Sequence, residues 1–252
     1  MHVLGGPAPE IPRPGRYVLP LLERRSESPS VMTFHFSTRG SGFRYLSNQA
    51  IRLSLPGVDD PWGAVRAFSL SSSPTETDRL SVTCRISDTP FKQALARLRP
   101  GDPAEVYGPL GGFLLDRQRP AVFLAGGIGI TPFRGMLRYA IDSGDTEPRL
   151  LLYSARVPEE LVFHAELDAM VRASALHGVR YTVTRPADST ASWTGRVGRI
   201  SPEWIREAAA SLEHPKFYVA GLPAMVEETV TALRGELAVP EDDIDYEVFR
   251  GF

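Results

Sequence analysis

The chain has 252 residues, which is enough for one large domain or two domains of common size. Its net charge of −2 gives no indication of nucleic-acid binding, and it contains no apolar run near the ~20 residues that a membrane span requires. A single cysteine, Cys84, excludes an intrachain disulfide and a cysteine-ligated cluster, and the five scattered histidines show no metal-ligand spacing, so we expect no metal site.

The N-terminal segment, residues 1–16, is rich in proline and glycine, which predicts a loosely held tail. It lacks the cationic start and long apolar centre of a signal peptide. We therefore expect a cytoplasmic protein whose first domain begins at residue 17.

Residues 17–107 carry the signals of a small antiparallel β-barrel, because short β-prone runs alternate with turns. One helix interrupts the strands, with Thr89 as its expected N-cap and Pro90 at its first position. The expected strands cover residues 17–23, 31–37, 50–55, 65–70, 80–86 and 104–107.

From residue 120 the pattern changes to alternating strands and helices. This alternation predicts a parallel sheet covered by helices on both faces, with ligands at the carboxyl ends of its strands. We therefore expect a barrel domain at residues 17–116 and a nucleotide-binding α/β domain at residues 117–252. The expected strands cover residues 122–125, 149–154, 180–184, 217–220 and 244–249, and the expected helices cover residues 132–143, 158–173, 202–211 and 223–235.

A glycine-rich loop joins the first of these strands to the first helix. Gly127 and Gly129 precede a helix that carries Pro132 in its first turn. A strand, a glycine turn and a helix in this order point backbone N–H groups and a positive dipole end at a phosphate. A tight turn in an ordinary α/β unit is the alternative, because Pro132 stands where the usual dinucleotide fingerprint has its third glycine.

The segment Arg66-Ala67-Phe68-Ser69 lies on an expected barrel strand. Alternation puts Arg66 and Phe68 on one side and the other two residues on the opposite side, unless the strand twists or ends there. An arginine can bind a phosphate, an aromatic ring can lie on a flat heterocycle, and a hydroxyl can meet a ring nitrogen. Taken alone, the segment also suits an ordinary strand.

Five motifs, in this order, resemble those of the ferredoxin–NADP reductase superfamily of flavin enzymes. RAFS is similar to its Arg-x-Tyr-Ser flavin motif, GPLGGF at residues 108–113 to its Gly-Pro-x-Gly-x-Phe turn, and GGIGITP at residues 126–132 to its nicotinamide-nucleotide loop. AGLPAM at residues 220–225 resembles its Cys-Gly-x-x-x-Met turn, and the ending EVFRGF resembles its Glu-x-Phe-x-Gly-Tyr. The resemblance covers residues 17–252 and implies a flavin-binding β-barrel followed by an α/β nucleotide domain.

The first cofactor that the resemblance implies is FAD. Arg66 would hold the flavin's phosphates, Phe68 would lie against the isoalloxazine, and Ser69 would form a hydrogen bond near N5. The segment 85–92 would wrap the diphosphate, with the N-terminus of its helix supplying donors, and its presence favours FAD over FMN. The implied flavin-binding residues are Arg66, Phe68, Ser69, Arg85, Thr89, Phe91, Lys92, Gly108 and Gly111.

The second implied cofactor is a nicotinamide dinucleotide. Ser154 and Arg156 stand at the end of an expected strand, where enzymes that prefer NAD often carry an acidic residue. A serine and an arginine suit a 2′-phosphate better, so we expect NADPH, with NADH as the alternative. The residues implied to cradle its diphosphate or to border the nicotinamide are Gly127, Gly129, Thr131, Pro132, Gly221 and Met225.

The expected catalytic residues are Ser69 and three residues near the end of the chain. Glu247 would orient the nicotinamide or relay a proton beside the reacting rings. One or both of Phe249 and Phe252 would cover the flavin and move aside for the nicotinamide. The alternative is a hydrophobic plug that anchors the chain end.

Three residues depart from the motifs of the superfamily. Phe68 replaces a tyrosine, which removes a hydroxyl contact worth about 1 kcal/mol. Ala220 replaces a cysteine, a change that would slow hydride transfer or alter specificity, and Pro90 removes one N–H donor from the diphosphate segment.

We therefore expect an enzyme that transfers hydride from NAD(P)H to FAD and passes electrons to a separate ferredoxin, flavodoxin or oxygenase component. One alternative is a flavin-binding electron-transfer or regulatory subunit that does not itself oxidise NAD(P)H. Another is a diaphorase or flavin reductase that uses free flavin, which the missing tyrosine hydroxyl favours.

Overall fold

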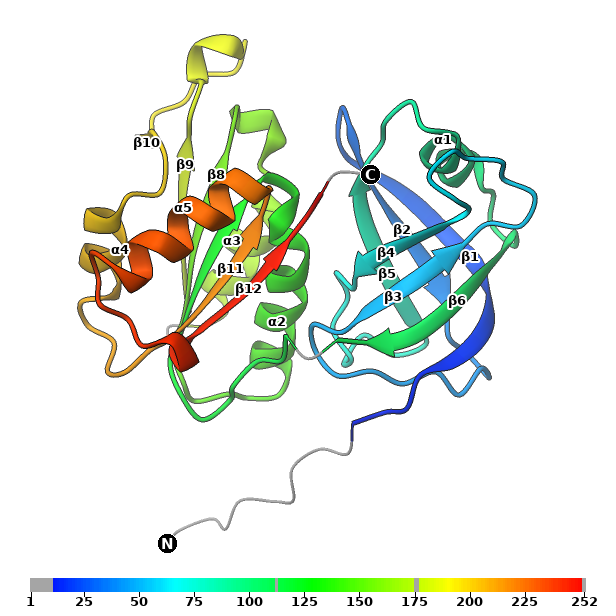
Figure 1. Cartoon of the computed structure of the whole chain (residues 1–252), viewed down its shortest axis with the longest axis horizontal. Helices are drawn as coiled ribbons and strands as arrows, with labels where there is room; N and C mark the ends of the chain where they lie inside the picture. Colours follow the sequence, from blue (N-terminus) through cyan, green and yellow to red (C-terminus); the bar gives the residue numbers. More distant parts are fainter. Residues whose placement is uncertain (1–10, 112, 175–176, 251–252) are drawn as a thin grey trace, which may run out of the picture.

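The computed structural model describes residues 11–111, 113–174 and 177–250. Two six-stranded sheets lie side by side, an N-terminal barrel and a C-terminal sheet flanked by helices (Figure 1). This arrangement confirms the predicted fold class. In the described ranges, no helix is both long enough and apolar enough to cross a membrane.

The N-terminal sheet is antiparallel and closes into a barrel. Leu70 forms a bridge to Val82, which brings the two outermost strands of the sheet together. The first strand begins at Gly15, which pairs with Gly108, so the predicted tail is two residues too long. The strands are β1 (Gly15–Ser28), β2 (Val31–Ser37), β3 (Ala50–Ser54), β4 (Val65–Ser69), β5 (Arg79–Arg85) and β6 (Pro103–Leu110), in the spatial order β4-β3-β6-β1-β2-β5.

Helix α1 (Pro90–Arg97) lies against one end of the barrel (Figure 1). Thr89 caps it as predicted, since its hydroxyl accepts a hydrogen bond from the Lys92 N–H. Phe91 and Leu95 are fully buried in the barrel core. Burial of these two apolar residues, four positions apart, fixes the face that α1 turns to the barrel.

The C-terminal sheet is parallel, and helices cover both of its faces (Figure 1). Phe123 packs with α2 and α3 on one face, whereas Val122 and Leu124 pack with α4 and α5 on the other. A strand that is buried on both faces needs a continuous apolar run, which explains the sequence AVFLA. The elements are β7 (Ala121–Gly126), η1 (Gly127–Gly129), α2 (Ile130–Asp142), β8 (Arg149–Ala155), α3 (His164–Arg172), β9 (His177–Val183), β10 (Arg196–Val197), α4 (Pro202–Ala209), β11 (Lys216–Gly221), α5 (Pro223–Arg234) and β12 (Ile244–Val248), with strand order β10-β9-β8-β7-β11-β12.

The predicted helix at residues 158–173 is wrong in its first part. A 3₁₀ turn covers Pro158–Glu160, and the α-helix begins only at His164 because Phe163 has a left-handed backbone with φ of 64°. The buried Tyr153 hydroxyl accepts the Val162 N–H at 3.1 Å, which holds this turn outside a helix. Strand β10 was not predicted, and β12 ends at Val248, one residue before its predicted end.

Helix α2 docks the α/β domain onto the barrel. A Cβ added at Gly135 would lie 2.8 Å from the Ser72 carbonyl oxygen, so only glycine permits this approach. The neighbouring Arg134 forms ion pairs with Glu76 of the barrel and with Glu166 of α3. These contacts fix the two domains so that the ends of β4 and β12 face each other.

Candidate active site

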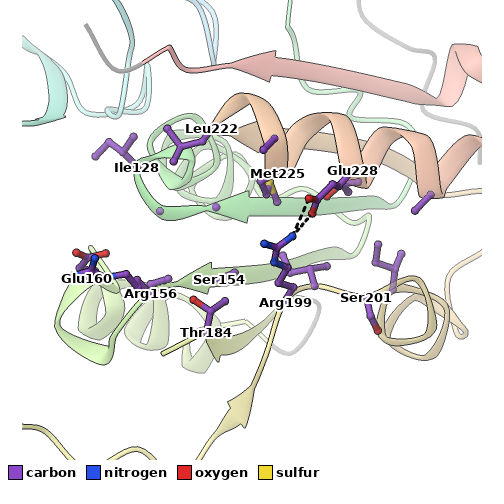
Figure 2. Close-up of a pocket in the computed structure, with 18 of the residues that line it drawn as sticks. Ile128, Ser154, Arg156, Glu160, Thr184, Arg199, Ser201, Leu222, Met225 and Glu228 are labelled. Atoms are coloured by element: carbon purple, nitrogen blue, oxygen red, sulfur yellow. Dashed lines mark hydrogen bonds and ion pairs between the residues drawn. The ribbon is translucent and has the colours of Figure 1, made fainter. Parts of the chain in front are cut away.

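Two cavities adjoin at the border between the domains. The larger, of about 740 Å³, lies at the carboxyl ends of β7 and β8, beside α4 and α5 (Figure 2). The smaller, of about 360 Å³, lies between the barrel and the end of β12. Arg85 and Ile128 line both cavities, so the RAFS segment and the glycine-rich loop open onto one shared crevice.

The smaller cavity collects most of the residues predicted to bind flavin and three of the four predicted catalytic residues. Thr131 also lines it, although we had expected this residue at the nicotinamide diphosphate. Phe252 lies outside the described residues. The predicted residues on the cavity wall are Arg66, Phe68, Ser69, Arg85, Lys92, Glu247 and Phe249.

Ser69 and Glu247 meet across the domain border. The Ser69 hydroxyl donates to Glu247 Oε1 at 2.6 Å. Burial raises the pKa of Glu247, and the hydrogen bond from Ser69 opposes this effect without cancelling it. Strict alternation would bury only one of the neighbours Phe68 and Ser69. Both are buried, because β4 ends at Ser69 and Glu247 covers the Ser69 side chain. The pair can therefore hold or move a proton on the wall of the smaller cavity.

Arg66 is buried in the wall of the smaller cavity and is already engaged by the protein. Its Nη2 lies 2.8 Å from Asp60 Oδ1, and its Nη1 donates to the carbonyl oxygens of Trp62, Gly63 and Val65. Only its Nε is buried without a hydrogen-bond partner. An unsatisfied buried donor on a cavity wall fits a missing acceptor, such as a ligand oxygen.

Lys92 and Phe68 form a second part of this wall. The Lys92 Nζ lies 4.6 Å from the centroid of the Phe68 ring, and the Lys92 residue is only 5% exposed. Its charge also acts on Cys84, whose thiol pKa is raised by burial against the opposing effect of Lys92. An aromatic face, a buried cation and a hydroxyl are groups that fit a flat, anionic cofactor such as a flavin nucleotide.

Four of the residues predicted to bind flavin line neither cavity and have structural contacts instead. Thr89 caps α1, and Phe91 lies in the barrel core. A Cβ on Gly108 would lie 2.9 Å from Ile51 Cγ2, and Gly111 has a φ of 87°.

The glycines of the nicotinamide loop have different roles. Gly127 lines the larger cavity with a φ of 54°. Gly129 lines neither cavity, because it packs against β11, where an added Cβ would collide with the Ala220 carbonyl oxygen. Gly221 packs closely on Met225, and Pro132 is buried in the first turn of α2. Of the glycines predicted to bind the coenzyme, Gly127 alone lines this cavity, together with Gly126, which was not predicted.

The larger cavity contains Ser154, Arg156 and Met225 as predicted, and several residues that the sequence did not reveal (Figure 2). Arg199, just before α4, points across the cavity to Glu228 of α5, with an Nη1–Oε2 distance of 2.6 Å. Sequence reasoning missed Arg199, because a lone arginine beyond a two-residue strand belongs to no recognisable pattern. The further polar lining residues are Glu160, Thr184, Ser201, Thr229 and Glu236.

Two cavities share a wall: the larger lies at the carboxyl ends of parallel strands, and the smaller carries an aromatic face, buried cations and the Ser69–Glu247 pair. This arrangement is that of an NAD(P)H-dependent flavoprotein reductase. Residues 123–231 match the model of the oxidoreductase NAD-binding domain family. The chain is also 34% identical over 238 residues to ferredoxin–NADP reductase B of Sorangium cellulosum, covering 90% of this chain and 95% of that protein. The chain therefore belongs to the ferredoxin–NADP reductase family.

Two further comparisons agree with this assignment. A crystal structure of a ferredoxin–NADP⁺ reductase from Neisseria gonorrhoeae with bound FAD and NADP has a TM-score of 0.74 and 25% identity, covering 94% of this chain and 99% of that one. The reductase component of a phenol 2-monooxygenase from a Pseudomonas species is 26% identical over 82% of this chain. The match spans only 58% of that component.

Proposed function

We propose that this chain uses NADPH to reduce a bound FAD and passes the electrons to a separate small redox protein or oxygenase component in the cytoplasm. FAD, when bound, accepts a hydride and releases electrons one or two at a time. The observation that supports this proposal most strongly is the Ser69–Glu247 hydrogen bond, which joins the two domains on the wall of the smaller cavity. The barrel domain, residues 17–116, would hold the flavin, and residues 117–252 would hold the coenzyme.

Ser69 and Glu247 would serve as the proton-handling pair of the reaction. A carboxyl group whose pKa is raised by burial can take up a proton closer to neutral pH than an ordinary glutamate. Ser69 connects that carboxyl to the smaller cavity. Phe249 is held by its own N–H, which donates to the Gly221 carbonyl at 2.8 Å, and its ring would shield the cavity from water.

The larger cavity favours NADPH over NADH. Arg156 and Arg199 supply positive charge beside hydroxyls that can donate hydrogen bonds to a 2′-phosphate, although three glutamates, Glu160, Glu228 and Glu236, also line the cavity. Glu228 partly neutralises Arg199, so the preference for NADPH would be moderate. The hydroxyl-bearing residues are Ser154, Thr184, Ser201 and Thr229.

The electron acceptor would be a separate protein. The printed names of two relatives, a ferredoxin–NADP reductase and a monooxygenase reductase component, support acceptors of these two kinds. A ferredoxin, a flavodoxin or the oxygenase component of a two-protein system would fit.

Steady-state NADPH oxidation tests this function. We expect purified protein with FAD to oxidise NADPH rapidly only when a ferredoxin or flavodoxin, with cytochrome c as final acceptor, is added. NADH should react with a lower kcat/KM. Turnover that needs excess free flavin and no protein acceptor would indicate a flavin reductase instead. Flavin binding without any NADPH or NADH oxidation would indicate an electron-transfer subunit.

A further inference from the structure

The smaller cavity has walls from both domains. On the barrel side it is lined by residues of β3, β4, β5 and α1, and on the other side by η1, the start of α2 and residues 247–250. A molecule in this cavity therefore contacts both domains. Movement of one domain away from the other would open the cavity between these two walls, so the strength of the domain border determines how firmly a ligand is retained.

The border between the domains is held largely by polar side chains. The Thr75 hydroxyl donates to Asp142 Oδ2 at 2.5 Å, and Arg85 Nη2 lies 3.6 Å from Glu160 Oε2. Val31 of β2 adds an apolar contact, because it lies in a buried core cluster of the α/β domain. The Arg85 side chain is about half exposed, and exposed ion pairs contribute little to stability. A change of charge should matter most where a charged side chain is buried at the border.

Arg134 is such a buried charge. It belongs to α2, which lies on the side of the α/β domain that faces the barrel (Figure 1), and its side chain is only 12% exposed. Its Nη1 donates to the Ser71 carbonyl oxygen at 3.1 Å and forms an ion pair with Glu76, both in the barrel domain. Its Nη2 donates to Glu166 Oε1 of α3 at 2.5 Å. One guanidinium group therefore joins a carboxylate of each domain.

The two carboxylates depend on Arg134. Burial alone would raise the pKa of Glu76, but the hydrogen bond and the charge of Arg134 outweigh this effect and lower the pKa below its usual value. Glu76 therefore stays ionised at neutral pH. The Glu76 and Glu166 side chains are both largely buried. Without the guanidinium group, two like charges would face each other across the border and repel.

We infer that Arg134, Glu76 and Glu166 form an ionic clasp that keeps the domains closed, and that a flavin enters and leaves the smaller cavity when this clasp opens. This inference rests on the proposed function, because it concerns the flavin that the smaller cavity would hold. Arg134 lines neither cavity, so it is a positioning residue that acts through the two cavity walls. The clasp would make FAD a resident cofactor and not an exchangeable substrate.

A cross-link between the domains tests this inference. Thr75→Cys together with Asp142→Cys places two thiols where a hydroxyl and a carboxylate now meet, outside both cavities. The rise of flavin fluorescence after dilution measures the release of FAD from the loaded protein, and mass spectrometry verifies the cross-link. We expect the oxidised protein to release FAD at least about tenfold more slowly than the same protein reduced with a phosphine. The reduced protein is the matched control.

Variants of the clasp complete the experiment. Arg134→Met should speed FAD release by about tenfold or more, because it leaves two buried carboxylates without their partner. Adding Glu76→Gln and Glu166→Gln removes the repulsion and should return the rate to within about threefold of the wild type. Arg172→Met removes an exposed arginine from the last turn of α3 and should release FAD like the wild type. Thermal unfolding verifies that each variant is folded.

Equal rates of FAD release before and after reduction of the cross-link would overturn the inference, because the flavin would then leave without separation of the domains. A wild-type rate in folded Arg134→Met, or a fast release that the two glutamine substitutions do not correct, would also overturn it. If the wild type binds FAD and is reduced by NADPH in these cases, the proposed function stands and only the clasp fails. If the wild type binds no FAD, both the proposed function and the inference fail.

Discussion

The Ser69 hydroxyl lies 2.6 Å from Glu247 Oε1, which joins the end of barrel strand β4 to the last strand of the α/β sheet. The two residues are 178 positions apart in the chain. Helix α2 helps to hold the two domains in the position that this contact needs, through Gly135 and the Arg134 ion pairs. The candidate active site therefore depends on domain docking as much as on its own residues.

Replacing Ser69 by alanine should slow the reduction of bound flavin. The substitution removes a hydrogen bond to a carboxylate, worth about 2 kcal/mol, and so predicts a roughly 30-fold lower rate. Anaerobic stopped-flow absorbance with NADPH measures this rate. Ser37→Ala, a serine of the barrel that lines neither cavity, serves as the matched control. A rate within twofold of the wild type would show that the contact has no catalytic role.

The raised pKa of Glu247 predicts a pH dependence of electron delivery. The carboxylate must be ionised to take up a proton as electrons leave, so the rate should fall as pH falls through this pKa. The fall should be centred above the value of about 4.3 that is usual for glutamate. Glu247→Gln should be slower by about 100-fold and should lose this titration. If Glu247→Gln shows the same pH dependence of the rate as the wild type, Glu247 is not the group that takes up the proton.

The raised pKa of Glu247 also makes the free energy of unfolding depend on pH. Because the folded-state pKa of Glu247 lies above the unfolded value, the folded state binds this proton more tightly. The stabilisation from this group is complete below the unfolded pKa and is lost as pH rises through the folded pKa. The free energy of unfolding of the wild type, measured with urea, should therefore fall as pH rises from the unfolded-state pKa through the folded-state pKa. The fall should be smaller in Glu247→Gln.

Glu228 should limit the preference for NADPH. Glu228→Gln would release Arg199 from its ion pair and make it available to a 2′-phosphate. Because both side chains are largely exposed, the gain should be modest, roughly two- to fivefold in kcat/KM for NADPH, with NADH unchanged. Glu227→Gln removes the same charge one residue away, outside the cavity lining, and should have no such effect. An equal gain for both coenzymes would refute a role in phosphate selection.

Gly129 should be required for packing more than for binding phosphate. An added Cβ would collide with the Ala220 carbonyl oxygen, so Gly129→Ala should lower the free energy of unfolding by about 2 kcal/mol. Gly178→Ala on β9 is the control, because its Cβ would lie 3.4 Å from Leu150 Cδ1, an ordinary contact. Urea denaturation of both variants measures the difference. Equal stability of Gly129→Ala and the wild type would rule out this packing role.

Most of the fold could be predicted because it follows from local patterns. The apolar residues Phe133, Met136, Leu137 and Ala140 recur in α2 at the spacing of one helix face, and all four are fully buried. The turn at Phe163 could not be predicted, because it depends on a hydrogen bond to Tyr153, a residue of the preceding strand. Local periodicity carries no information about such contacts.

The contacts within the candidate site could not be predicted from the sequence. Motif order placed Ser69 and Glu247 near the reacting rings, whereas their hydrogen bond needed the relative position of two domains. The neutralisation of Arg66 by Asp60 was not foreseen, because Asp60 lies in an irregular loop without a recognisable motif. Arg199 was missed for the same reason, as it follows a two-residue strand.

Anaerobic mixing of the FAD-loaded protein with NADPH, followed by the absorbance of the flavin, tests the central claim most directly. Because the two cavities share lining residues, we expect bound NADPH to reduce the flavin directly. The yellow absorbance of oxidised flavin, near 450 nm, should then bleach within about a second, since typical kcat values are roughly 1–1,000 s⁻¹. Persistent yellow colour with both NADPH and NADH, in a protein that retains its flavin, would contradict the claim that the two cavities form one active site.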